Sequence, residues 1–196
     1  MVISGPYNYY YYNEPLYYDA LSEVRKRLEQ KPLTEPGEAT QTDRCFEAGV
    51  KSFEAGNYAE AIAWFHNALE LAPDDIVLPF AYVQEFFAND EYKKAAEVLR
   101  TTLSEAPPEE EGVFYPRGLY PDDNVLNGQI KQLSRAVRLN PFDANLQLLL
   151  GYQLLGMGRL DEAAEPLQKA QQDSDNHQAA TLFMSLLEKL KNADEK

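Results

Sequence analysis

The chain has 196 residues, of which 44% are hydrophobic and 26% charged, so it can bury the core of one domain and wholesale disorder is disfavoured. With 18 Lys and Arg against 32 Asp and Glu, its formal net charge of -14 argues against nucleic acids and anionic membrane surfaces as partners. Because no apolar run reaches the roughly 20 residues of a membrane span and no signal peptide is visible, we expect a soluble protein, cytoplasmic by default, with an extracytoplasmic location left open.

Residues 1–41 form a tyrosine-rich segment, which holds seven of the 13 tyrosines within its first 18 residues. Apolar residues at helical spacing between Leu16 and Leu28 predict a helix through about Gln30, and Pro32 and Pro36 indicate a linker up to residue 41. The tyrosine bias is compositional and defines no motif. Two interpretations stay open: a flexible leader, or an aromatic segment that docks on a protein surface.

The following part of the chain repeats every 34 residues, as Pro73, Pro107 and Pro141 show. Before the repeat boundary, a small residue, a large apolar residue and a second small residue recur at fixed spacing: Ala61-Phe65-Ala68, Ala95-Leu99-Thr102 and Ala163-Leu167-Ala170. This pattern predicts pairs of antiparallel helices, most of which end at a proline. The predicted units are residues 42–75, 76–109, 110–143 and 144–175.

The third unit departs from the pattern. Its second helix is expected at about Asp123–Asn140, but residues 110–122 contain two prolines and two glycines, which cannot sustain a regular first helix. We expect a loop there, with one short helical turn at most. Its large apolar residues, Phe114, Leu119 and Tyr120, either fill the gap left by the missing helix or form a contact site for a partner.

Residues 176–191 predict a final amphipathic helix, with an apolar stripe that runs from Ala179 to Leu190. A stack of helix pairs needs such a cap, because its last apolar face would otherwise be exposed.

These features resemble the tetratricopeptide repeat (TPR), whose signature combines Leu-Gly, a Tyr, Ala-x3-Phe, a small residue and a closing Pro. The first unit matches best, with Gly49, Tyr58, Phe65 and Pro73 in register, and the resemblance covers residues 42–191. It implies an all-α fold: a right-handed solenoid of about three and a half helix-turn-helix repeats with a C-terminal capping helix. The loop of the degenerate third repeat is similar to one found in a poorly characterised bacterial group of TPR proteins.

Residues that could carry catalysis or bind a metal are few. His66 and His177 lie far apart, and neither has a Cys, His or Asp at metal-ligand spacing. The single cysteine, Cys45, cannot form an internal disulfide and is interpreted as a small buried hydrophobe. Asp122-Asp123-Asn124 suits a helix N-cap better than a calcium loop, since Leu126 stands where an oxygen ligand is needed. We expect no catalytic, cofactor or metal site, and no enzyme activity.

The resemblance also implies a concave groove lined by the first helix of each unit. The repeat register places nine residues there: Phe46, Val50, Phe53, Phe80, Gln84, Phe87, Leu148, Tyr152 and Leu155. The Lys and Asn with which the family clamps a peptide's terminal carboxylate are absent, because Phe46, Val50 and Ala81 stand at such positions.

The expected function is a non-enzymatic protein–protein interaction module or scaffold. Its expected ligand is a protein or peptide with apolar anchors and basic flanks, since the groove is apolar and its rim acidic. One alternative is that the groove aromatics only pack between helices. Another is structural self-assembly, in which the tyrosine-rich segment docks into the groove of its own molecule or, in a homo-oligomer, of a neighbour.

Overall fold

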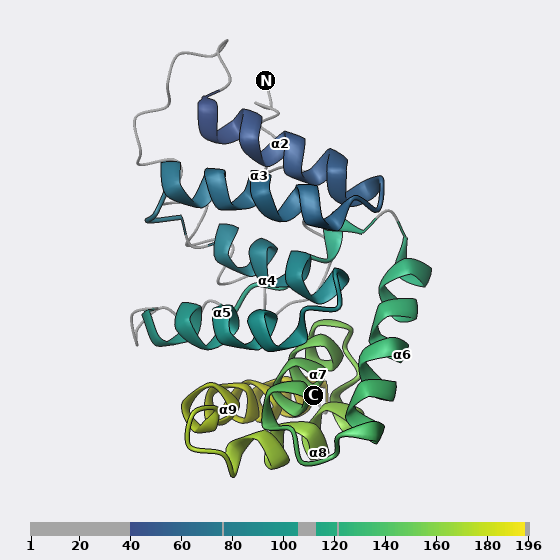
Figure 1. Ribbon diagram of the computed structural model, residues 1–196. Coiled ribbons are helices and arrows are strands. Elements are labelled where there is room, and N and C mark those ends of the chain that lie inside the picture. The colour runs from purple at the N-terminus through teal and green to yellow at the C-terminus, as the bar shows by residue number, and fades with distance from the viewer. Residues whose placement is uncertain (1–39, 76, 106–112, 121, 195–196) are drawn as a thin grey trace.

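The computed structural model describes residues 40–75, 77–105, 113–120 and 122–194. Within these ranges the chain forms eight α-helices, one short 3₁₀ helix and no strand, which confirms the all-α solenoid (Figure 1). In chain order the elements are α2 (Gln41–Glu54), α3 (Tyr58–Leu71), α4 (Leu78–Ala88), α5 (Tyr92–Glu105), η2 (Arg117–Leu119), α6 (Asp123–Leu139), α7 (Ala144–Gly156), α8 (Leu160–Gln171) and α9 (His177–Asp194). The helix predicted between Leu16 and Gln30 lies outside the described residues.

Small residues let the two helices of a unit approach closely. The ring of Phe65 in α3 lies so near Gly49 in α2 that a Cβ atom added at Gly49 would be 2.4 Å from Cε2 of the ring. Gly151 in α7 has the same relation to Leu167 in α8, where an added Cβ would be 2.3 Å from Cδ2. The first and fourth units are therefore built alike, as the sequence repeat predicted.

The turn inside each of these regular units contains one residue with left-handed backbone geometry. The φ angle is 78° at Gly56, 60° at Asp90 and 69° at Gly158. Glycine adopts this conformation without steric cost, and Asp is one of the few other residues that tolerate it. At Asp90 the carboxylate accepts a hydrogen bond of 2.5 Å from the hydroxyl of Tyr92, which holds the turn.

The third unit does not stack between the second and the fourth. Instead α5 of the second unit packs directly against α7 of the fourth, and α6 lies along one side of the stack, packed against α7 (Figure 1). The sequence predicted α6 and the short helical turn before it, which is η2. It did not predict that the second and fourth units would be direct neighbours.

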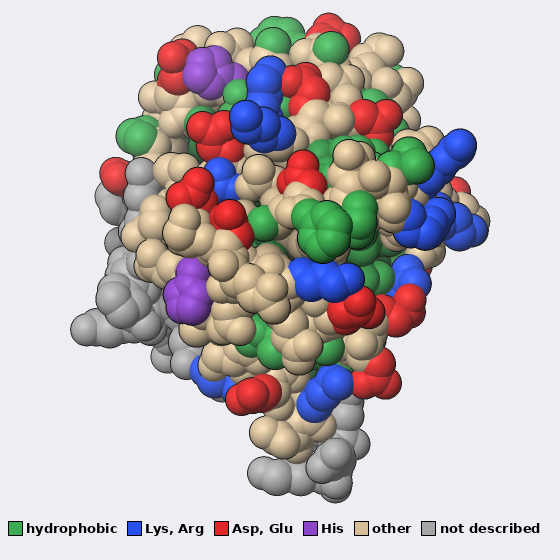
Figure 2. All heavy atoms as spheres, turned by 60° about the horizontal axis from the view of Figure 1, so that its bottom comes forward, with side chains coloured by type: hydrophobic (Ala, Val, Ile, Leu, Met, Phe, Trp, Pro, Cys, Tyr) green, Lys and Arg blue, Asp and Glu red, His purple; other side chains and the backbone are tan. Residues whose placement is uncertain are grey.

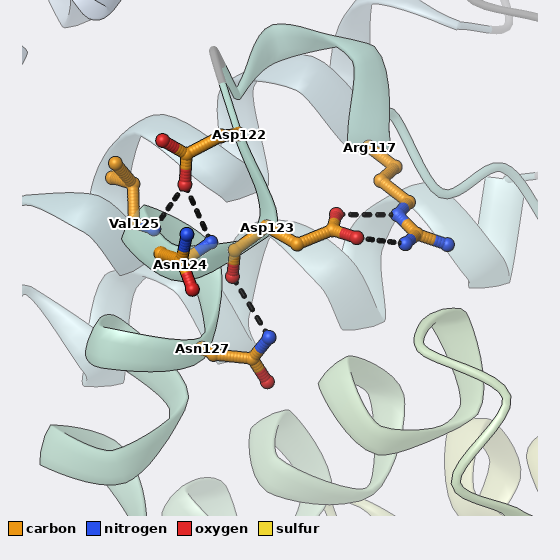
Figure 3. A network of polar contacts seen from close by, with 6 residues as sticks. All are labelled: Arg117, Asp122, Asp123, Asn124, Val125 and Asn127. Atoms are coloured by element: carbon orange, nitrogen blue, oxygen red, sulfur yellow. Dashed lines mark hydrogen bonds and ion pairs between the residues drawn. The ribbon is translucent and has the colours of Figure 1, made fainter.

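Polar contacts fix the start of α6 (Figure 3). Asp122 is its N-cap, and Oδ1 of this residue accepts hydrogen bonds from the backbone N–H of Asn124 at 2.6 Å and of Val125 at 3.2 Å. Arg117 of η2 forms a two-pronged ion pair with Asp123, in which Nε lies 2.8 Å from Oδ1. These acidic residues therefore cap a helix, as predicted, and join η2 to α6.

The predicted C-terminal cap is α9, which packs against α8 at the far end of the stack. Its Phe183 is buried and stacks on Tyr152 of α7, with ring centroids 5.6 Å apart. Nearby, the guanidinium of Arg100 in α5 donates hydrogen bonds to Oδ1 of Asn145 and, at 2.9 Å, to Oδ1 of Asn176. Arg100 thereby ties the second unit to the fourth unit and to the start of the cap.

Candidate functional site

The nine residues predicted to line a groove lie on α2, α4 and α7, as the repeat register requires. Val50 is half-exposed, and the other eight are buried. The inner face of the stack is therefore closed. In this structure eight of the predicted groove positions are covered: Phe46, Phe53, Phe80, Gln84, Phe87, Leu148, Tyr152 and Leu155.

The inner face is covered by residues 113–120 of the same chain, which we call the inner segment. Phe114 faces Phe80 of α4 with ring centroids 5.7 Å apart. Tyr120 meets Phe53 of α2 edge to face at 5.0 Å. Leu119 between them is 1% exposed. The structure thus confirms that the apolar residues of this loop fill the space left by the missing first helix of the third unit.

Hydrogen bonds from tyrosine hydroxyls anchor both ends of the inner segment. The hydroxyl of Tyr120 donates to Oε1 of Gln84, which is fully buried in α4, at 2.9 Å. The hydroxyl of Tyr152 in α7 donates to the backbone carbonyl of Phe114 at 2.6 Å. The carbonyl of Phe114 is not part of a helix, so it needs a hydrogen-bond donor from elsewhere when it is buried. The hydroxyl of Tyr152 is that donor.

The middle of the inner segment is held by α7. Tyr115 lies against Gly156, where an added Cβ would be 2.1 Å from Cδ2 of the tyrosine ring. Its hydroxyl donates a hydrogen bond of 2.6 Å to Oε1 of Gln153, and Nε2 of Gln153 donates to Oε1 of Gln84 at 3.2 Å. Sequence reasoning missed these two glutamine contacts, since nothing in the repeat pattern distinguishes a buried glutamine from an exposed one.

Some buried polar atoms of the inner face have no hydrogen-bond partner within the described residues. They are both carboxyl oxygens of Glu85, Nε2 of Gln84 and Oε1 of Gln129. Burial raises the pKa of Glu85 to about 9, so its carboxyl group is protonated and neutral at pH 7. One glutamate among 32 acidic residues carries no signal in the sequence. Only its position in the otherwise mostly apolar helix α4 could have marked it.

One edge of the inner face is closed by α6. Nε2 of Gln129 in α6 donates a hydrogen bond of 3.0 Å to the hydroxyl of Tyr58 in α3. Beside this contact a solvent-open hollow of about 470 Å³ lies between α6 and the turn from α4 to α5. Its lining includes Asp90 and several amide side chains but no Lys, Arg or His. This edge is therefore mildly acidic and polar.

The described residues include few groups of the kinds that bind metals or act as nucleophiles. Among them, no group of three or more His, Cys, Asp and Glu could hold a metal ion. His66 is exposed, with Nε2 3.6 Å from Oε1 of Glu70, and Cys45 is buried. No helix in the described ranges has the length and apolar character needed to cross a membrane.

The alternative in which the tyrosine-rich segment occupies the groove concerns residues 1–39, which lie outside the described ranges. The aromatic positions that such a segment would contact, among them Phe53 and Phe80, are already in contact with Tyr120 and Phe114 of the inner segment.

Comparison with known proteins identifies one family from the sequence. Two models of the tetratricopeptide repeat match the chain, over residues 52–112 and 130–179. Among solved structures, a MamA fragment from Desulfovibrio magneticus is 15% identical, with 82% of this chain and 100% of that one covered and a TM-score of 0.35. TTC0263, a TPR protein of Thermus thermophilus, is 21% identical, with coverages of 74% and 82% and a TM-score of 0.33. No curated protein matches the chain.

Proposed function

Since the chain belongs to the tetratricopeptide repeat family, we propose that it is a non-enzymatic protein-interaction module. Its inner face would recognise a peptide with apolar anchors and a basic residue beside them. The observation that supports this proposal is the inner segment, which lies on that face as a ligand would. The face therefore has the shape and polarity to hold a short segment that includes one 3₁₀ turn, η2.

The inner segment has the chemistry that the sequence led us to expect of a partner. Its anchors are Phe114, Leu119 and Tyr120, all buried against the stack. Arg117 lies between these anchors and pairs with Asp123 at the acidic edge. An external peptide with aromatic anchors and a basic residue at the same spacing would make equivalent contacts.

The inner segment leaves some buried polar atoms of the stack without a hydrogen-bond partner. This favours its replacement by an external peptide. Glu85 and Gln84 keep polar atoms unpaired beneath the covered region, and each unpaired buried group costs about 1–3 kcal/mol. A partner that supplied a donor or acceptor to these atoms would recover part of that cost. Gln84 already accepts from Tyr120, so it lies within reach of whatever occupies the face.

A resident segment competes strongly with any partner. Because the inner segment is tethered to the stack, its effective concentration at the inner face is on the order of millimolar. An external peptide therefore binds weakly until the inner segment is released. We infer a module that is closed at rest and opened by loosening residues 113–120.

The test uses a fluorescent peptide with the sequence of residues 113–120, Val-Phe-Tyr-Pro-Arg-Gly-Leu-Tyr, and fluorescence anisotropy. The protein variants are Phe114→Ser and the double variant Phe114→Ser, Leu119→Ser, whose own segment has lost anchors. We expect both to bind the peptide at least about tenfold more tightly than the unaltered protein, because the tethered competitor is weakened.

Two controls make the outcome decisive. A peptide with serine in place of its Phe, Leu and Tyr residues should not bind any variant. Phe142→Ser removes an exposed phenylalanine and should leave peptide binding as in the unaltered protein. If the single variant keeps its helical circular dichroism and still fails to bind the peptide, the inner face is a permanent core and not a binding surface.

A further inference from the structure

The outer face of α6 carries a row of basic side chains. Lys131, Arg135 and Arg138 are spaced four and three residues apart, so they lie on one side of the helix, and all are exposed. None of them forms an ion pair within the part of the chain that the structure describes. Between Asp123 and Asp143 the sequence contains no Asp or Glu, although the whole chain has 32 in 196 residues. The row is thus locally basic in an acidic protein.

Two exposed apolar residues continue this row at its C-terminal end. Leu139 is 73% exposed and Phe142 is 98% exposed, more than any other large hydrophobic residue in the described ranges. Figure 2 shows hydrophobic side chains at the surface of this end of the molecule, with Lys and Arg side chains toward the edge along which α6 lies. Apolar and cationic groups therefore meet on one surface.

The fold does not use this surface. On α6 the buried residues are Leu126, Gln129, Ile130 and Leu133, which lie on the other side of the helix from the basic row. The nearest acidic residue in sequence, Asp143, is occupied: its Oδ1 accepts hydrogen bonds from the backbone N–H of Asn145 at 3.0 Å and Leu146 at 3.1 Å. Arg138 stands in the last turn of α6, where a cation suits the negative end of the helix dipole, but within the described residues no ion pair accounts for Lys131 or Arg135.

We propose that Lys131, Arg135, Arg138, Leu139 and Phe142, which we call the α6 ledge, dock an acidic segment of a partner protein that carries an apolar side chain. Carboxylates pair with arginine in a two-pronged geometry, and an apolar side chain between them covers Leu139 and Phe142. Local charge complementarity selects this occupant, because three exposed cations lie within a stretch that contains no Asp or Glu, and an acidic segment offers them carboxylates.

The α6 ledge is independent of the inner face. It lies on the opposite side of α6 from Gln129, which contacts Tyr58 of the stack. It would also select the opposite charge, since the inner face is proposed to take a basic residue. Failure of peptide binding at the inner face therefore leaves the α6 ledge untouched, and failure of docking on the ledge leaves the inner face untouched.

The experiment selects a phage-displayed library of short random peptides on the full-length protein. Counter-selection on the Arg138→Glu, Phe142→Ser double variant removes peptides that bind elsewhere. We expect the enriched peptides to carry several Asp or Glu residues around a Leu, Phe or Trp. Enriched peptides that are basic or uncharged would overturn the proposal.

Single variants then locate the site. By fluorescence anisotropy with an enriched peptide, Arg135→Glu, Arg138→Glu and Phe142→Ser should each weaken binding at least about tenfold. Two exposed residues elsewhere provide matched controls: Lys93→Glu on α5 and Leu71→Ser on α3 should leave binding unchanged. If Lys93→Glu weakens binding as much as Arg138→Glu does, the attraction is general and the proposal fails.

Two further measurements test other occupants of the ledge. Sedimentation equilibrium detects a second copy, and co-sedimentation with phosphatidylserine vesicles detects an anionic membrane. If the protein self-associates or binds vesicles, and Phe142→Ser abolishes this, then a second copy or a membrane occupies the ledge and the proposal of an acidic partner fails. We expect neither, and retention of a monomer in solution without vesicle binding supports the proposal.

Discussion

Tyr120 donates a hydrogen bond of 2.9 Å to Oε1 of Gln84, and the same oxygen accepts one of 3.2 Å from Nε2 of Gln153. A single amide oxygen therefore joins the inner segment, the second unit and the fourth unit. Because Gln84 is fully buried, its oxygen has no water to replace a lost donor. The inner segment is thus hydrogen-bonded into the contact between α4 of the second unit and α7 of the fourth unit.

The burial of Leu119 in the inner segment should contribute measurably to the free energy of unfolding. Leu119 is 1% exposed, so Leu119→Ala leaves a cavity between the segment and the stack. We expect a loss of about 2–5 kcal/mol, measured by urea denaturation. Leu139→Ala removes the same atoms at a site that is 73% exposed and should change stability by less than about 0.5 kcal/mol. Equal effects of the two changes would contradict the packing described for Leu119.

Two glycines in helices should respond to alanine in opposite directions. At Gly49 the added Cβ would be 2.4 Å from the ring of Phe65, which is fully buried and cannot retreat, so Gly49→Ala should cost about 1–3 kcal/mol. At Gly128 in α6 no atom lies within 4 Å of an added Cβ, so Gly128→Ala should stabilise the helix by about 0.5–1 kcal/mol. Thermal denaturation of the two variants measures both changes in stability. If both variants are stabilised or both destabilised, the contacts described for the two glycines are wrong.

The parts of the fold that the sequence predicted are those that depend on local and nearest-neighbour packing. The spacing that aligns Ala61-Phe65-Ala68 with Ala163-Leu167-Ala170 reports how two adjacent helices fit together. It therefore led to the close contacts of Gly49 with Phe65 and of Gly151 with Leu167. The N-cap at Asp122 was likewise readable, because a cap involves only the residues that follow it.

The closed inner face was not predictable in the same way. The repeat register shows that Phe53 and Phe80 face inward, but it contains no information about what covers them. The cover, residues 113–120, has no periodicity, and it contacts helices from three different units. The register likewise contains no information that α7 of the fourth unit packs directly on α5 of the second.

Two substitutions of Asp122, the N-cap of α6, should differ in their effect on stability. Asp122→Ala removes the acceptor for the backbone N–H groups of Asn124 and Val125 and should cost about 1 kcal/mol. Asp122→Asn keeps an acceptor oxygen and should cost far less, since asparagine is an equally good N-cap. Hydrogen exchange at the first amides of α6 should quicken only in the alanine variant. Equal exchange in both variants would show that the carboxylate charge, not the cap, stabilises this end.

The buried carboxyl of Glu85 should make stability depend on pH. Burial raises its pKa from 4.5 to about 9. Between these values the unfolded chain has lost the proton while the folded chain keeps it, so the unaltered protein loses stability as pH rises. Glu85→Gln has no proton to lose. We expect the variant to match the unaltered protein near pH 4 and to exceed its free energy of unfolding by about 3 kcal/mol at pH 7.

Urea denaturation of both proteins at a series of pH values between 4 and 8 measures this difference. Glu97→Gln is the matched control, because Glu97 is exposed on α5 and its substitution removes the same charge at the surface. Its effect should stay within about 0.5 kcal/mol across the range. A difference between Glu85→Gln and the unaltered protein that stays constant with pH would mean that Glu85 is ionised in the folded state. It would then need a cation beside it, and none is hydrogen-bonded to its carboxyl within the described residues.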